Sequence, residues 1–325
     1  MKLILIGVPQ LTSSYFAGTI KAYVSSSCIA SIFWNFPMKK RKQIHLSPLL
    51  PLFILVIGVF FWYQSRAIPA IDEEHQMTIL PSAISHVLGA KVGNTAREIR
   101  IPMLFYHYVE YVENDPGRQN LNIPPNILIS QIETLKNAGY TFIFPKDLAG
   151  AIVGKEKLPQ KVIILSFDDG YMDFYTNVFP ILQNEHVKAI AYIVPNFLDR
   201  PNYMFTFQLE EIARSPLIEI GAHTMDHYAL AGMNTKEAAY EIAQSRKVLQ
   251  AMLHVPIDSF AYPYGSFDLS TVQIVKATGF TNAVSVIPGV MQSMDNEYFV
   301  SRLRPGYRTG HVLLDYLQQN TFQPW

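Results

Sequence analysis

The sequence predicts an α/β fold, a distorted β/α barrel that follows a single N-terminal membrane helix. From residue 99 onward, short apolar runs alternate with longer amphipathic ones, as strands and helices do in parallel sheets. The runs KVIILSF and AIAYIV are apolar on both faces, which is typical of strands covered on both sides. Before the barrel, residues 46–63 carry no charge, and at helical rise these 18 residues span roughly 27 Å of bilayer.

The composition limits the classes of function. The chain has 325 residues, enough for one large domain with extensions. Lys plus Arg and Asp plus Glu number 26 each, so the basic excess of nucleic-acid-binding proteins is missing and we expect no nucleic-acid partner. Cys28 is the only cysteine, which excludes an intrachain disulfide and a cysteine-based metal site.

The membrane segment is predicted at residues 38–63 as a signal-anchor. The basic cluster KKRK at 39–42 precedes the apolar run and places its N-terminal side in the cytoplasm. The domain that follows is then extracytoplasmic, held at the cell membrane by a single pass. The alternative is a cleaved signal, which would make the domain secreted. The sequence indicates no particular protein partner.

The segments on either side of the anchor have weaker patterns. Residues 1–37 are apolar but patchy, and Met38 followed by KKRK is a better start for a signal segment than Met1. We therefore expect residues 1–37 to be a gene-model extension, with a first membrane pass around 12–36 as the alternative. Residues 64–98 are expected to be a linker, and residues 99–325 form the globular domain.

The elements of this domain follow in order along the chain. Strands are predicted at residues 102–106, 162–166, 189–194, 218–221, 259–262, 283–286 and 300–303. Helices are predicted at residues 127–138, 235–253 and 270–278. Gly139 and Gly279 end the first and last of these helices, and Thr235 is the expected cap of the middle one. In such barrels the chemistry gathers where the strands end.

The first motif, SFDDG at 166–170, ends a predicted strand. Two adjacent carboxylates, Asp168 and Asp169, are costly in an apolar setting unless a positive charge compensates them, and a metal ion is the usual solution. The motif also resembles a Walker B strand, but the nearest candidate phosphate loop, at 150–156, has the wrong spacing and lacks its Ser or Thr. An aspartyl nucleophile of the phosphatase kind is a further alternative.

The second motif, HTMDH at 223–227, follows the strand at 218–221. On a helical turn, His223 and His227 would face the same way. Two imidazoles plus a carboxylate from another strand make a three-ligand site with open positions, the arrangement of catalytic metals. Two structural histidines are the alternative when this motif is taken alone.

The third motif, PYG at 263–265, ends another predicted strand. Pro and Gly force a sharp turn, which can direct a backbone N–H into a site as an oxyanion stabiliser requires. Taken alone, the motif is better explained as an ordinary turn.

Together and in this order, the three motifs resemble the polysaccharide deacetylase family (NodB homology, carbohydrate esterase 4), over about residues 100–305. The resemblance implies a distorted β/α barrel and the hydrolysis of N-acetyl groups on an amino-sugar polymer. It implies Asp168 as general base. It implies Asp169, His223 and His227 as ligands of Zn²⁺, with Co²⁺ or Ni²⁺ as alternatives. The Tyr264 backbone N–H would stabilise the oxyanion.

The chain departs from the family pattern at two points. Many members carry an Arg shortly before the PYG turn to orient the base; residues 258–262 contain none, and Arg302 or Arg304 is the candidate substitute. The late catalytic His is also missing, because His311 lies in an expected terminal helix. The opening PMLFYH at 102–107 resembles the exported branch that acts on poly-N-acetylglucosamine, which implies His107 as general acid, with a pKa near 6.5 suited to neutral pH.

Other functions stay open on the sequence. A catalytically inactive glycan-binding barrel is one, and a metal-dependent hydrolase of a small amide is another. A cytoplasmic phosphatase would leave the histidine pair unexplained. The polymer is not specified: poly-N-acetylglucosamine, peptidoglycan and chitin-like glycans all fit. Tyr171, Tyr228 and Phe267 lie near the motifs and are the candidates for a sugar-facing wall.

Overall fold

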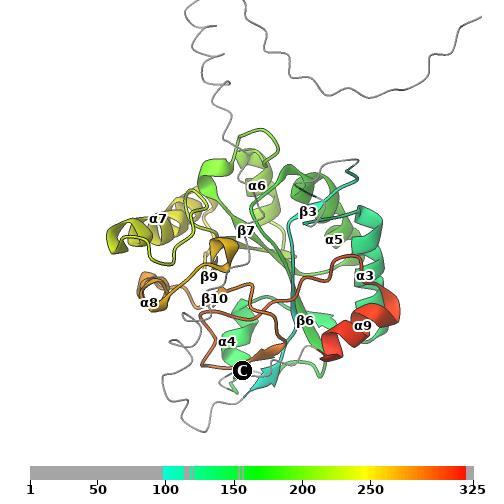
Figure 1. Ribbon diagram of the computed structural model, residues 1–325. Coiled ribbons are helices and arrows are strands. Elements are labelled where there is room, and N and C mark those ends of the chain that lie inside the picture. Colours follow the sequence, from blue (N-terminus) through cyan, green and yellow to red (C-terminus); the bar gives the residue numbers. More distant parts are fainter. Residues whose placement is uncertain (1–97, 113–117, 119–120, 153, 156, 320–325) are drawn as a thin grey trace, which may run out of the picture. The chain divides into compact units, whose positions relative to one another are not determined.

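The computed structural model describes residues 98–319, apart from 113–117, 119–120, 153 and 156 (Figure 1). The predicted extension, the membrane segment and nearly all of the predicted linker lie outside the described residues. Among the described helices, none is both long and apolar enough to cross a membrane.

A curled, parallel seven-stranded sheet forms the centre of the domain. Its strands run in the order β10-β9-β8-β7-β6-β2, and β5 pairs with the start of β6. Their bounds are β2 (Met103–Tyr106), β5 (Thr141–Phe142), β6 (Val162–Phe167), β7 (Ala189–Ile193), β8 (Ile218–Ala222), β9 (Ser259–Ala261) and β10 (Asn282–Val284). Six of the seven predicted strands are confirmed within one or two residues.

The seventh prediction, a strand at 300–303, is wrong. This segment makes one isolated bridge to each edge of the sheet, Val300 to Val284 and Leu303 to Leu104. It therefore joins the edge strands β10 and β2 without enough continuous pairing to form a strand of its own. Two short pairs lie outside this sheet: β1 (Ile99–Arg100) with β11 (Met291–Gln292), and β3 (Tyr108–Val109) with β4 (Asn122–Ile123).

Helices surround the sheet, as Figure 1 shows. They are α3 (Pro125–Asn137), α4 (Lys146–Ile152), the π-helix η2 (Phe174–Val178), α5 (Phe179–Glu185), η3 (Pro195–Phe197), α6 (Thr206–Ala213), α7 (Thr235–Leu253), η4 (Pro263–Gly265), α8 (Leu269–Thr278) and α9 (Gly310–Gln319). Helix α7 has the predicted bounds, but its cap differs from the prediction, because the Asn234 side chain, and not that of Thr235, accepts the hydrogen bond from the Lys236 N–H. Gly279, at φ 91°, ends α8 as predicted.

Side chains fill the interior of the curled sheet. Met103, Ile164 and Tyr192 belong to one buried cluster on this inner face, while a larger cluster packs the outer face against the helices. Tyr192 needs the glycine on the neighbouring strand, because a Cβ at Gly221 would lie 2.4 Å from its ring. The interior is a packed core, so substrate chemistry must take place at an end of the sheet.

The alternation of side chains along the strands selects the residues at that end. Met103 and Ile164 point inward, and side chains two and four positions further along a strand face the same way. This parity brings His107 after β2 and Asp168 after β6 to the inner rim. Because Tyr106 pairs with Phe167, His107 and Asp168 are the next two residues in register.

Candidate active site

The acidic motif forms a tight turn directly after β6. Asp168 continues the sheet, since its N–H donates to the Tyr106 carbonyl at 2.9 Å. Asp169 then takes φ 76° and Gly170 φ 80°. Left-handed backbone is costly for a residue other than glycine and gathers at functional sites. The turn directs two successive, nearly fully buried carboxylates to different partners.

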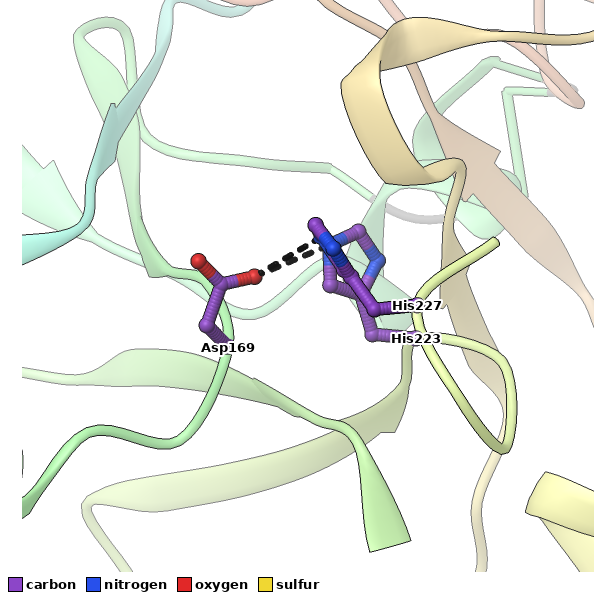
Figure 2. Close-up of side chains that lie close together, drawn as sticks. All are labelled: Asp169, His223 and His227. Carbon is purple, nitrogen blue, oxygen red and sulfur yellow. Dashed lines mark ion pairs between the residues drawn. The ribbon is translucent and has the colours of Figure 1, made fainter. Parts of the chain in front are cut away.

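Asp169 faces the two histidines of the second motif (Figure 2). Its Oδ1 lies 3.3 Å from Nε2 of His223 and 3.1 Å from Nε2 of His227. One ligand atom from each residue lies within 4.8 Å of the other two. The predicted ligand set therefore comes together from two strand ends.

The histidine motif is not helical, contrary to the expectation of a shared helical turn. Residues 223–227 form an irregular loop, in which Thr224 and His227 take φ values of 60° and 61°. The Thr224 hydroxyl accepts from the His227 N–H at 2.9 Å. The carboxylate of Glu241, on α7, accepts from the N–H groups of Met225 and Asp226 at 2.9 and 3.0 Å. Glu241 cannot be identified from the sequence, because only the fold brings α7 to this loop.

Hydrogen bonds on the far side of each ring orient the histidines. Nδ1 of His223 donates to the Ala261 carbonyl at 2.7 Å, and Nδ1 of His227 lies 3.0 Å from the Tyr264 hydroxyl. Such partners fix the tautomer and the direction of ligating histidines. They leave both Nε2 atoms directed at Asp169.

The residues present fit a divalent cation. Oδ1 of Asp169 is buried and receives no well-directed hydrogen bond from the described residues. Burial alone would raise the pKa of Asp169, but the His227 and His223 imidazoles hold it well below 3.8, so the carboxylate is ionised. Two imidazoles and one carboxylate are the donor set of three-ligand catalytic zinc sites.

Asp168 pairs with a buried arginine from the segment that joins the sheet edges. Nη1 and Nη2 of Arg302 each donate to one oxygen of Asp168 at 2.8 Å. Arg302 is 1% exposed; its remaining donors reach the Ser285 carbonyl and the Ser166 hydroxyl, and Phe105 lies against its guanidinium. Burial opposes ionisation of Asp168, yet Arg302 lowers the pKa below 3.8. Of the two predicted candidates, Arg302 is therefore the residue that orients Asp168.

The third motif turns sharply beside His227. Tyr264 takes φ 58° and ψ 10°, a left-handed conformation inside the turn, and its hydroxyl lies 3.0 Å from Nδ1 of His227. The next residue must be glycine, because a Cβ on Gly265 would lie 2.3 Å from a methyl group of Val286. The structure thus places Tyr264 at the site, and its N–H stays the predicted oxyanion donor.

His107 lies at the same rim, next to Asp168. Burial lowers its pKa below 6.5, and the carboxylates of Asp169 and Asp168 only partly oppose this effect. Its Nδ1 has no hydrogen-bond partner within the described part of the chain. Burial therefore favours the neutral imidazole, and the acid form of His107 is populated at lower pH than that of an exposed histidine.

The remaining candidates lie elsewhere. His311 is exposed on the terminal helix α9, as expected, and Arg304 stacks on Phe105 at 5.2 Å. Phe267 is wrong as a sugar-facing residue, since it is 7% exposed and packs in the outer core. Tyr171 is largely buried between Tyr108 and Tyr203, whereas Tyr228 is 55% exposed beside His227.

Comparisons with known proteins agree with this geometry. Residues 155–283 match the family model described as polysaccharide deacetylase. YxkH of Bacillus subtilis (strain 168), whose name assigns it to the polysaccharide deacetylases, is 26% identical over 65% of this chain and 73% of its own. The poly-beta-1,6-N-acetyl-D-glucosamine N-deacetylase of Staphylococcus aureus (strain MRSA252) is 22% identical over 82% of this chain and 93% of its own.

A solved structure extends the match to the fold. The Streptococcus pyogenes deacetylase PplD, in complex with acetate, superposes with a TM-score of 0.63 at 23% identity, over 70% of this chain and all of that one. At this identity the likeness concerns the fold. The family match over residues 155–283, the three motifs and their assembly at one rim of the sheet together identify this part of the chain as a polysaccharide deacetylase domain.

Proposed function

We propose that this polysaccharide deacetylase is metal-dependent, works outside the cytoplasmic membrane and acts on poly-β-1,6-N-acetylglucosamine. The observation that carries the proposal is the Asp169–His223–His227 site beside the buried Asp168–Arg302 pair. One group of residues has the donor set for a cation, and the other holds an ionised carboxylate beside it. A cation that polarises the carbonyl and a carboxylate that accepts a proton from water can together hydrolyse an unactivated amide.

Asp169, His223 and His227 would hold the cation, for which we propose Zn²⁺, with Co²⁺ or Ni²⁺ as alternatives. When bound, such an ion lowers the pKa of water and polarises a carbonyl group.

The chain's own residues supply the proton transfers and the orientation. Asp168 is kept ionised and immobile by Arg302 and accepts a proton from the attacking water. The Tyr264 N–H donates to the oxygen that gains negative charge as the amide carbon becomes tetrahedral. His107 in its acid form gives a proton to the departing sugar nitrogen. Water adds to the carbonyl carbon, the C–N bond breaks, and acetate and a free amine result.

The names of the relatives and the N-terminal sequence support the proposed polymer and location. The Staphylococcus aureus relative, which aligns along 82% of this chain, is named for poly-β-1,6-N-acetylglucosamine. The basic cluster at 39–42 and the apolar run at 46–63 have the composition of a membrane anchor with an external C-terminal domain. A polymer outside the cell is the substrate that such an anchored enzyme could reach.

Acetate release from β-1,6-linked N-acetylglucosamine oligomers of increasing length tests the proposal. The full-length chain, loaded with Zn²⁺, is compared with His223→Ala and Asp168→Asn. His311→Ala is the matched control, because His311 is exposed on α9. We expect release that grows with oligomer length, is lost in the two site variants and is unchanged in the control.

The alternatives predict other results in the same assay. A glycan-binding barrel would bind the oligomers and release no acetate. A small-amide hydrolase would be as active on the monosaccharide as on long oligomers. Either result would contradict the proposed function.

A further inference from the structure

His107 lies in a bend, so its direction depends on how the chain is held on both sides of it. Before His107, β2 is fixed by its ladder with β6. After it, the chain leaves the central sheet and forms β3 with Tyr108 and Val109. The ladder does not extend past Tyr106, so the contacts of this second segment determine where the His107 ring points.

Two side chains hold the segment by the backbone of Val109. The Val109 N–H donates a short hydrogen bond to Oδ2 of Asp173, and the Val109 carbonyl accepts from Nδ2 of Asn177 at 2.8 Å. Val109 is fully buried and Asp173 is 6% exposed. Both polar groups of one peptide residue are thus satisfied by side chains, two positions after His107. We refer to Asp173 and Asn177 as the Val109 clamp.

The clamp belongs to the segment that carries the carboxylates of the site. Asp173 follows Asp169 by four residues, and Asn177 lies in the π-helix η2. A π-helical turn is a rare widening of a helix that occurs frequently at functional sites. One continuous segment, residues 168–177, therefore carries the base, a metal ligand and both residues that hold the His107 strand.

We infer that Asp173 and Asn177 are positioning residues, which fix the His107 imidazole relative to Asp168 and the metal site through the backbone of Val109. This inference rests on the proposed function, in which His107 is the general acid. A proton donor must lie within hydrogen-bond reach of the atom that it protonates, and a misplacement of about 1 Å can cost on the order of 10²-fold in rate.

Leucine at position 173 removes the acceptor while keeping the branched shape of the side chain. In the full-length, Zn²⁺-loaded chain, we expect Asp173→Leu to lower kcat for acetate release by on the order of 10²-fold, with KM and bound zinc little changed. Asp173→Asn keeps an amide oxygen for the Val109 N–H and should stay within about threefold of the wild type. Thr176→Ala is the matched control, because Thr176 is exposed on η2 and should not affect kcat.

The His107→Ala background separates positioning from a general structural effect. If the clamp acts through His107, Asp173→Leu lowers the rate of the wild type but not that of His107→Ala. The fall of kcat with rising pH should also be smaller in Asp173→Leu than in the wild type, as we expect for His107→Ala. Asn177→Ala removes the other half of the clamp and gives the same test independently if the leucine variant does not fold.

Three results would overturn the inference, and they can be told apart. Unchanged kcat in both Asp173→Leu and Asn177→Ala would refute the clamp alone. Equal losses in the wild-type and His107→Ala backgrounds would show a structural role only. A His107→Ala enzyme as fast as the wild type would refute the acid role in the proposed function, and the positioning role with it.

Discussion

Replacing Arg302 by methionine should destabilise the folded domain strongly and impair Asp168 as the general base. The guanidinium is fully buried and makes two 2.8 Å hydrogen bonds to Asp168. Methionine fills part of the space but leaves the Asp168 carboxylate buried without its cation. Removal of one partner of a buried ion pair costs about 3–5 kcal/mol of unfolding free energy. For a domain of this size, the melting temperature should fall by roughly 6–20 °C.

Urea unfolding followed by circular dichroism measures this cost. Arg214→Met is the matched control, because Arg214 is 75% exposed and pairs with Glu210 at the surface, where such pairs contribute about 0–1 kcal/mol. The double variant Asp168→Asn/Arg302→Met carries no unpaired charge and should lose less stability than Arg302→Met. In the single variant Arg302→Met, the acid limb of the kcat/KM–pH profile should move to higher pH, because burial raises the pKa of Asp168 once Arg302 no longer lowers it.

An unfolding free energy of Arg302→Met within about 1 kcal/mol of the wild type would refute this reasoning. So would a double variant less stable than the single one. Either result would mean that the site relaxes or admits water enough to solvate Asp168, and that the buried pair is not what keeps the base ionised.

Three further perturbations test other parts of the account. Burial raises the pKa of Glu219 from 4.5 to about 7, so the free energy of unfolding of the wild type falls as pH rises through this window. In urea titrations, Glu219→Gln should be more stable than the wild type by at most about 3 kcal/mol at pH 8 and equally stable at pH 4. Gly265→Ala should abolish activity through its contact with Val286, whereas Gly232→Ala, at a similar positive φ with nothing within 4 Å, should cost only about 1 kcal/mol and stay active. Because burial lowers the pKa of His107, the alkaline limb of kcat should lie below 6.5 and disappear in His107→Ala.

The repeating parts of the fold could be predicted from local patterns. The runs around Ile164 and Ile190 are apolar on both faces, and this pattern alone predicts buried parallel strands. Asp168 directly follows such a run, and His223 follows the strand predicted at 218–221, so their positions at the strand ends could also be derived. These features depend on residues that are neighbours in the sequence, so one sequence is enough to predict them.

The supporting residues could not be predicted, because they act over long sequence separations. Arg302 reaches Asp168 across 134 residues, and only the bridging of the sheet edges distinguishes it from Arg304. Glu241 looks like a surface position of an amphipathic helix until the histidine loop is placed beside it. Asp173 follows a recognised motif, but its partner is a backbone N–H in another strand.

The dependence of acetate release on bound zinc is the decisive test of whether the Asp169–His223–His227 site makes this enzyme metal-dependent. The full-length chain is stripped with a chelator, and Zn²⁺ is returned in known equivalents while acetate release from a β-1,6-linked N-acetylglucosamine oligomer is followed. We expect the stripped protein to be inactive, its activity to rise with added Zn²⁺ and saturate near one equivalent per chain, and His223→Ala not to recover. Full activity in the stripped protein, or recovery in His223→Ala equal to that of the wild type, would contradict it.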